Sequence, residues 1–331
     1  MRSKWYRAGA VILFLLVLAL TACHVQQRTD TRSDQISGRK YRVALVAKSA
    51  ESAFWKSVRA GANAASTEYN LDFVFQAPLS EEDYEAQNNM IESAVEDDAD
   101  AIVFSAVDFE ANAQAVDRAA EDGVKIVAID SEVNSEAVEC YIGTDNYEAG
   151  CLAGEAALAC GDPELNIGIV NFDKNSENGQ TREAGFRDTV SEDSRAVITD
   201  AINVNSTTEA AKQGTLDMIG RNPEINVIAT FNEWTSLGVG YAIQEQGLED
   251  EIHVVAFDSN VVSVGMLETG EVDALIVQNP YAMGYLGVEN AYNLINGQPV
   301  EKEEIDTSLL IVTKENMYDE ESQRLLFSFD K

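Results

Sequence analysis

Basic residues are scarce in this 331-residue chain, because 23 lysines and arginines stand against 57 aspartates and glutamates and the net charge is −34. Nucleic-acid binding needs basic surface to replace counterions, so this composition argues against that class of partner. Histidine occurs only as His24 and His253, and no G-x-G-x-x-G segment follows a β-rich run. These two shortages argue against a histidine-based catalytic triad and against a dinucleotide-binding loop.

Cysteine is also rare. Besides Cys23, the chain has only Cys140, Cys151 and Cys160, and this odd number argues against a disulfide framework. We expect Cys151 and Cys160 on one helix, where nine residues separate them by about 13 Å, too far for a bond. We interpret all three as small buried apolar residues, although one disulfide bond to Cys140 stays open. Nothing resembles a Cys/His metal motif, and we expect neither a metal nor another cofactor.

The N-terminal apolar run is too short to span a membrane. Residues 8–20 are uncharged and follow a basic head, but a spanning helix needs ~20 apolar residues. We therefore predict a secretory signal peptide at 1–22 rather than a transmembrane anchor. The run ends in "LTAC", which resembles a bacterial lipobox and implies that Cys23 is lipidated and starts the mature chain. Ordinary cleavage after Ala22, with soluble release, is the alternative.

A polar tether at 23–40 leads into a domain in which short apolar β-rich runs alternate with segments of helical spacing. The runs lie at 42–47, 72–76, 101–105, 125–129, 140–143, 167–172, 226–231, 252–257 and 273–278. This alternation predicts parallel sheets covered by helices on both faces. The segments "VALVAKSAESAFWKSVRAG" and "IGIVNFDKNSENGQTREAG" have a related character, which indicates two α/β lobes with a cleft between them.

Several predicted strands end abruptly in a polar residue. The residues in question are Asp130, Asp145, Asn232, Asp258, Gln278 and Asn279. Right-handed crossovers bring all strand C-terminal ends to one edge of a sheet, which is where ligands bind in open α/β sheets. Each residue alone could equally cap the next helix, but the set as a whole favours a polar, ligand-facing edge.

The order of segments along residues 41–315 resembles the type I periplasmic sugar-binding proteins, which are ribose-binding-like solute-binding lipoproteins of ABC transporters. The segments are "FWKSVRAGANAA", "AIVFSAVD", "IVAIDSEVNSE", "YIGTDNYEAG", "TREAGF", "TFNEWTSLGVGYAI", "VVAFDS" and "VQNPYAMGYLGVENAYNLINGQPV". The resemblance implies two doubly wound parallel-sheet lobes joined by three hinge crossings, near Asp145, Gln278 and Ser308. Lobe 1 would be 41–144 plus 279–307, and lobe 2 would be 145–278 plus 308–331.

The resemblance also implies the residues of a sugar site. Phe54 and Trp55 match the aromatic pair that lies on the apolar face of a sugar ring, although both could instead be core residues of their helix. Asp130 and Asp258 match carboxylates that accept hydroxyl hydrogens. The remaining matched positions are Ser52 before the aromatic pair and the amides Asn232 and Gln278.

Some positions depart from the ribose-type pattern. Ser131 and Gln180 stand where members often have arginine, and Arg182 is two places away from the second of these. Ser206 replaces the aromatic residue of the second lobe. Lys48 stands where many members have a small residue, and it either balances Asp130 or Asp258, meets an acidic ligand, or lies exposed at the rim. We keep Ser131, Gln180 and Lys48 among the expected site residues. These departures count against ribose but leave the identity of the sugar open.

The resemblance implies an exported binding protein that captures a monosaccharide or polyol and delivers it to an ABC permease. We expect a monomer, held by its lipid anchor on the outer side of the cytoplasmic membrane or in the periplasm. A sugar-sensing co-receptor for a membrane histidine kinase or chemoreceptor is the alternative. A lipid-anchored enzyme is disfavoured, because His253 and Asp258 begin and end one strand and so lie about 16 Å apart at opposite sheet edges.

Overall fold

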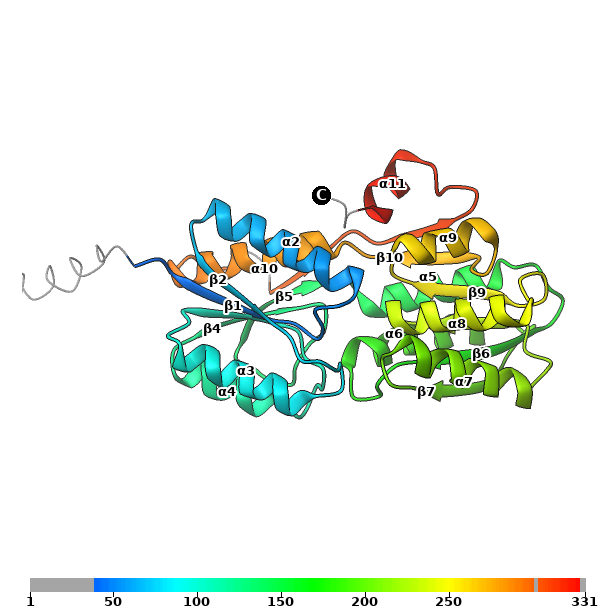
Figure 1. Ribbon diagram of the computed structural model, residues 1–331, viewed down its shortest axis with the longest axis horizontal. Coiled ribbons are helices and arrows are strands. Elements are labelled where there is room, and N and C mark those ends of the chain that lie inside the picture. Colours follow the sequence, from blue (N-terminus) through cyan, green and yellow to red (C-terminus); the bar gives the residue numbers. More distant parts are fainter. Residues whose placement is uncertain (1–38, 301–302, 328–331) are drawn as a thin grey trace, which may run out of the picture. The chain divides into compact units, whose positions relative to one another are not determined.

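The computed structural model describes residues 39–300 and 303–327 (Figure 1). The predicted signal peptide, Cys23 and nearly all of the predicted tether lie outside the described residues. Within the described ranges, none of the helices combines the length and the apolar character needed to cross a membrane.

The described residues form two sheets of six strands, in the orders β11-β5-β4-β3-β1-β2 and β12-β10-β9-β8-β6-β7. The strands of the first lobe are β1 (Arg42–Val46), β2 (Asp72–Gln76), β3 (Ala101–Phe104), β4 (Lys125–Ile129), β5 (Val138–Gly143) and β11 (Glu304–Asp306). Those of the second lobe are β6 (Leu165–Asn171), β7 (Ala196–Asn203), β8 (Val227–Thr230), β9 (His253–Phe257), β10 (Ala274–Val277) and β12 (Leu310–Thr313). The two orders are identical when β1 corresponds to β6, which confirms two α/β lobes of one topology.

Three edge strands were not predicted. β7 alternates between half-buried and exposed residues, and β11 is only three residues long and mostly exposed. β12 pairs with β10 in the antiparallel direction, whereas the other described pairs are parallel. Edge strands are covered less completely than central ones, which explains why β7 and β11 carry no long apolar run. β12 does belong to an apolar run, Leu309–Val312, and was missed for another reason: its antiparallel edge position breaks the strand–helix alternation.

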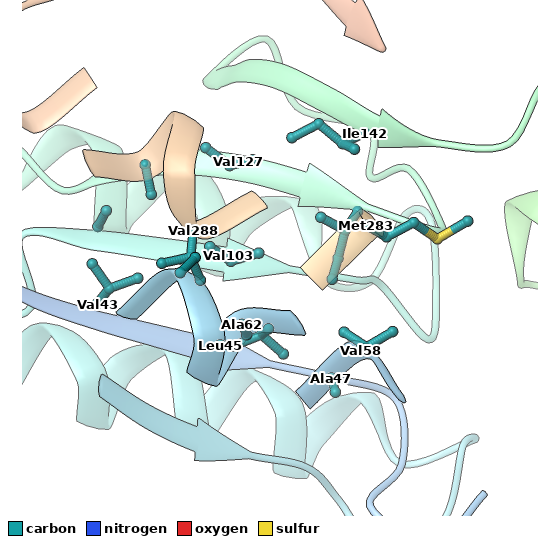
Figure 2. Close-up of a cluster of buried hydrophobic side chains, with 14 of the residues drawn as sticks. Val43, Leu45, Ala47, Val58, Ala62, Val103, Val127, Ile142, Met283 and Val288 are labelled. Atoms are coloured by element: carbon teal, nitrogen blue, oxygen red, sulfur yellow. The ribbon is translucent and has the colours of Figure 1, made fainter. Parts of the chain in front are cut away.

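Helices cover both faces of the first sheet. α2 (Ala53–Glu68) and α10 (Pro280–Ile295) pack on one face, while α3 (Tyr84–Glu96) and α4 (Ala113–Glu121) pack on the other. Figure 2 shows Val43 and Leu45 of β1 in one buried apolar cluster with Val58 of α2 and Val288 of α10. The C-terminal part of the chain therefore returns to complete the core that its N-terminal part begins.

The second sheet is covered in the same way. α5 (Asn146–Leu158) and α6 (Glu177–Ser191) pack on one face. α7 (Thr208–Arg221), α8 (Glu233–Gln246), α9 (Val261–Thr269) and α11 (Glu320–Leu326) contribute to the core on the other. A Cβ at Gly61 would lie 2.0 Å from a backbone oxygen of α10, and one at Gly185 would lie 2.1 Å from a backbone oxygen of α5. The two related sequence segments thus end in glycines that allow the same close helix crossing in each lobe.

The cysteines differ from the expectation in two respects. α5 ends at Leu158, so Cys160 lies beyond it and does not share a helix with Cys151. Cys140 is buried, but Cys151 and Cys160 are only half-buried, and no disulfide bond joins these three cysteines in the described part of the chain. Among the described residues, Cys140 is therefore not bonded to Cys151 or Cys160.

Candidate functional site

Two aspartates occupy equivalent places at the facing edges of the two sheets. Asp130 directly follows β4 and Asp258 directly follows β9, which is the corresponding strand of the other lobe. Both have a left-handed backbone, with φ values of 60° and 67°. This region is uncommon for residues other than glycine, and such strain persists mainly at functional sites. In each lobe, this left-handed residue turns the chain at the end of a buried strand and so sets the direction of its own carboxylate.

A polar pocket lies between these strand ends. Its walls come from both lobes: the ends of β1, β4, β6, β9 and β10, the N-terminal turns of α2, α6 and α8, and the loop before α3. The free space is about 30 Å³, close to the volume of one water molecule. A small-molecule site usually offers roughly 300 Å³ or more, so a ligand requires the side chains or the lobes to move apart.

Asp130 is bonded from the opposite lobe. Its carboxylate oxygens each accept from the Asn178 side-chain amide at 3.2 Å, and one accepts from Ser105 at 3.1 Å. The Lys48 ammonium and the Arg182 guanidinium lie 3.8 Å from its two oxygens. Since Asp130 is only 4% exposed, these cations offset the cost of burying its charge.

Lys48 lies inside the pocket rather than at its rim. Its ammonium donates to Ser176 at 2.7 Å and to Asn178 at 3.2 Å, both on the opposite lobe, and it lies 5.7 Å from the centre of the Phe172 ring. Burial lowers the pKa of Lys48, while Asp130 opposes that shift. Of the three possibilities for Lys48, the geometry favours the balancing of Asp130 and contradicts an exposed position.

Arg182 lines the pocket and holds the neighbouring groups in place through hydrogen bonds. Its guanidinium donates to the side chain of Asn146 at 2.8 Å, to the backbone oxygen of Phe231 at 2.8 Å and to Gln278 at 2.9 Å. It also lies 5.0 Å from the centre of the Phe257 ring. Planar, multiply bonded arginine is the preferred cation for buried positions, and here it holds Gln278 in place beside Asp258.

Asp258 is held by this arrangement but is less well compensated than Asp130. Gln278 donates to its carboxylate at 2.7 Å. Burial raises the pKa of Asp258 from an ordinary 3.8 to about 7, although Arg182 and the Gln278 bond act in the opposite direction. At neutral pH the group therefore exists in both protonation states, so it can either donate to or accept from a ligand hydroxyl.

Glu81 reaches the pocket from the loop before α3. Its carboxylate accepts from Ser206 at 2.7 Å and from the Trp234 indole at 3.1 Å, both in the second lobe. Part of the Glu81 residue is exposed, yet its carboxylate is enclosed, and this burial raises its pKa. Ser206, which takes the place of the family's second-lobe aromatic residue, thus joins Glu81 to Asn232, whose amide donates to the serine at 2.7 Å.

Glu233 forms a second contact between the lobes. It opens α8, and its carboxylate accepts from the backbone amides of Ala53 and Phe54 at 3.1 and 3.0 Å. These amides belong to the exposed positive end of the α2 dipole, which favours an anion. Asn260 donates to the same carboxylate at 3.1 Å. Burial raises the pKa of Glu233, against the effect of these bonds.

The predicted aromatic pair also lines the pocket. Phe54 and Trp55 are 7% and 3% exposed, and their rings meet edge to face at 5.1 Å. Both also belong to the α2 core cluster. Ser52 and Asn232 line the pocket and cap α2 and α8 at the same time, so the capping and ligand-facing interpretations both apply to them.

The structure brings most of the expected residues together, with two exceptions. Lys48, Ser52, Phe54, Trp55, Asp130, Asn232, Asp258 and Gln278 line the pocket. Ser131 is buried outside it, and its hydroxyl finds no hydrogen-bond partner among the described residues. Gln180 borders a different groove, while Arg182 takes the place expected for an arginine near it. Glu81, Asn178 and Glu233 were missed, because helix starts and loops carry no periodic signal.

Two lobes of one topology, with a charged pocket between their strand ends, define a two-lobed ligand-binding protein. The sequence profile of the periplasmic binding protein domain matches residues 43–299. The chain belongs to this family of periplasmic binding proteins, and membership implies an exported protein.

Individual relatives agree with this assignment. The chain is 26% identical over 288 residues to the D-ribose/D-allose-binding protein of Pseudomonas aeruginosa, covering 83% of this chain and 89% of the relative. It is 23% identical over 299 residues to the ribose import binding protein RbsB of Bacillus subtilis, covering 89% and 95%. A carbohydrate transporter solute-binding protein from Agrobacterium radiobacter, solved with D-arabinose, superposes with a TM-score of 0.85 at 30% identity, covering 88% of this chain and 100% of that one. An ABC transporter solute-binding protein from Agrobacterium vitis, solved with D-fucose, gives a TM-score of 0.82 at 31% identity, covering 86% and 99%.

Proposed function

We propose that this chain captures a neutral monosaccharide or polyol in the pocket between its lobes and delivers it to an ABC importer, without turning it over. The observation that carries the proposal is the pair Asp130 and Asp258, which present carboxylates from equivalent strand ends of the two lobes. A sugar offers hydroxyl donors around its edge and C–H groups on its faces. Carboxylates and amides suit the former, and the rings of Phe54 and Trp55 suit the latter.

The charges of the pocket favour a neutral ligand over a sugar acid. Lys48 and Arg182 are its only cations among the described lining residues, and both already lie near Asp130. Three further carboxyl groups line the same space, those of Glu81, Glu233 and Asp258. The pKa values of all three are raised by burial, so this pocket already disfavours negative charge. A carboxylate ligand would add another anion to it.

Capture requires the lobes to separate and close again. We propose lobe 1 at 41–144 plus 279–307 and lobe 2 at 145–278 plus 308–331, with crossings near Asp145, Gln278 and Ser308. The pairing of β11 with β5 and of β12 with β10 supports the last crossing, because the two short strands belong to different sheets. Closure around a ligand is a common hinge motion in two-lobed binding proteins.

A thermal-shift screen tests the ligand class. The panel includes D-arabinose, D-fucose, D-ribose and D-allose, together with polyols and the matching sugar acids. A ligand at 100 times its Kd should add about 2.7 kcal/mol of stability. We expect at least one neutral sugar or polyol to stabilise the chain, and its acid counterpart to bind at least tenfold more weakly. Stabilisation by acids alone would overturn the charge argument.

We further propose that the mature protein is a monomer attached to the membrane through lipidated Cys23. The lipobox-like "LTAC" after the apolar segment supports this attachment, since several acyl chains hold a protein stably on a bilayer. Cys23→Ala should release the protein from the membrane fraction and leave sugar affinity unchanged. Equal fractionation of wild type and variant would contradict lipidation at this residue.

A further inference from the structure

Three potential metal ligands meet at the edge of the second lobe opposite the sugar pocket. One ligand atom each from Cys160, Asp162 and His253 lies within 4.8 Å of the others. His253 begins β9, while Cys160 and Asp162 lie between α5 and β6. Since β9 ends just before Asp258, a five-residue strand places this cluster about 16 Å from the sugar pocket.

The orientation of His253 leaves one ring nitrogen aimed at the other ligands. Nδ1 lies 3.1 Å from Asp273 Oδ1, and the second oxygen of Asp273 accepts from the backbone amide of Val254 at 2.8 Å. Because both oxygens of Asp273 act as acceptors, Nδ1 carries the hydrogen. Nε2, the other ring nitrogen, lies 3.9 Å from Asp162 Oδ2. A carboxylate behind a histidine is the usual support of a metal-binding imidazole.

Asp162 is also supported from behind. Asn226 donates to its carboxylate at 3.1 Å, and Arg195 donates to its backbone oxygen at 3.0 Å. The positive charge of Arg195 is balanced by Asp193, which it contacts at 2.7 Å, so it does not leave the cluster with an uncompensated cation. Gly161 has a φ of 88° and lets the chain reverse between Cys160 and Asp162.

We propose that Cys160, Asp162 and His253 form a site for a divalent transition-metal ion, with Zn²⁺ as the preferred cation. A thiolate, an imidazole and a carboxylate together suit Zn²⁺ rather than Ca²⁺ or Mg²⁺, which prefer oxygen ligands. Ligand bonds of about 2.0–2.3 Å require the three atoms to draw closer than they lie here. Side-chain rotations in the half-buried loop of Cys160 and Asp162 supply that movement.

The test uses the purified chain, reduced and freed of metal, titrated with Co²⁺ and then with Zn²⁺. We expect one equivalent of Co²⁺ to produce a sulfur-to-metal charge-transfer band in the near ultraviolet, and Zn²⁺ to abolish the band by displacement. Cys160→Ser should remove the band, and His253→Gln should weaken binding more than tenfold. Asp273→Asn should weaken binding but keep the band, because it removes the support of the imidazole and not a ligand.

Matched variants distinguish this site from other thiols and from the N-terminal histidine. Cys151→Ser and His24→Gln should bind Co²⁺ like the wild type, and thermal unfolding without metal checks that every variant is folded. The proposal is overturned if the folded wild type gives no charge-transfer band, or if Cys160→Ser keeps it. It is equally overturned if the band is lost in His24→Gln, since the metal would then sit at the N-terminal segment. Sugar affinity should be the same with and without Zn²⁺, so this test is independent of the proposed function.

Discussion

Asp130 and Asp258 are structural counterparts with different electrostatic surroundings. Each follows the corresponding strand of its lobe with a left-handed backbone. Two cations lie 3.8 Å from Asp130, whereas Asp258 receives one hydrogen bond from Gln278 and has a pKa raised to about 7. The repeated topology thus supplies two carboxylates, of which one lies beside two cations and the other titrates near neutrality.

The titration of Asp258 predicts a pH-dependent stability. Its folded pKa lies above its unfolded value of 3.8, so the folded state binds the proton more tightly. Stability is therefore greatest below the unfolded pKa and falls as pH rises towards 7, by up to about 4 kcal/mol for this group alone. Asp258→Asn cannot ionise, yet its amide oxygen can still accept from Gln278. Urea unfolding between pH 4 and pH 8 should show a smaller decline for this variant than for the wild type.

Arg182, Glu233 and Asp130 also influence the Asp258 carboxyl group, so the comparison needs variant and wild type measured at each pH. The stability difference between them should grow in favour of the variant as pH rises from the unfolded pKa of 3.8 towards 7, and should level off above it. Parallel curves for the two proteins would mean that Asp258 does not titrate in this range.

The Lys48–Asp130 pair should behave as an energetically coupled unit. Removing one partner of a buried ion pair leaves the other uncompensated and costs about 3–5 kcal/mol. Lys48→Met alone should therefore destabilise the protein strongly. The double variant with Asp130→Asn should lose less stability than the sum of the two single variants, by roughly 0.5–3 kcal/mol. Urea denaturation of the four proteins measures this coupling.

Lys56→Met provides the control for the first variant, because Lys56 is an exposed lysine on α2. Its stability should stay within about 0.5 kcal/mol of the wild type. If the losses of Lys48→Met and Asp130→Asn simply add, the 3.8 Å pair makes no net contribution.

Glu233 should prolong the closed state. Its carboxylate bridges from α8 to the first amides of α2 in the other lobe, and charged hydrogen bonds of this kind contribute about 1.5–3 kcal/mol. Glu233→Gln should speed sugar dissociation by about tenfold or more, with little change in the order of sugar preference. Glu85→Gln is the matched control, since Glu85 is an exposed glutamate in the first turn of α3. Stopped-flow measurements on both variants test this, and equal dissociation rates in Glu233→Gln and wild type would rule out a bridging role.

The repeated lobe topology could be predicted because central parallel strands are buried on both faces and form continuous apolar runs. β9, for example, has four buried residues in succession before Asp258. β7 has exposed residues throughout its length and gives no such signal. Whether a strand lies at the edge of its sheet depends on which other strands pair with it. This is a property of the whole fold and not of the strand's own sequence.

The pattern of strands predicted pocket residues only at strand ends, whereas Ser52, Phe54 and Trp55 were predicted from the family resemblance. Asp130, Asp258 and Gln278 occupy such ends, but Glu81 and Glu233 reach the pocket from a loop and a helix start whose position depends on the opposing lobe. Gln180 was predicted to line the pocket but lies outside it, and the reason is related. Two residues along a helix correspond to a rotation of about 200°, so Arg182 and Gln180 lie on opposite sides of α6, and the sequence alone did not fix its orientation.

Trp55 should act through its flat face rather than through core volume alone. It lines the pocket but is only 3% exposed, so truncation to alanine would also cost several kcal/mol of packing, typically about 3–5. Substitution by phenylalanine and by leucine separates the two roles, because both keep an apolar side chain and only phenylalanine keeps an aromatic face. We expect Trp55→Leu to lose more than tenfold in sugar affinity and Trp55→Phe to lose only a few-fold, with both variants folded.

Calorimetric titration measures the affinities, and X-ray scattering should show a smaller radius of gyration with sugar than without it for the wild type and for Trp55→Phe. Where sugar binding is followed by intrinsic fluorescence, Trp234→Phe is needed as a control, since Trp234 contacts Glu81 in the same pocket. If Trp55→Leu binds sugar as tightly as Trp55→Phe, then Trp55 serves the α2 core and the sugar face is covered by another ring.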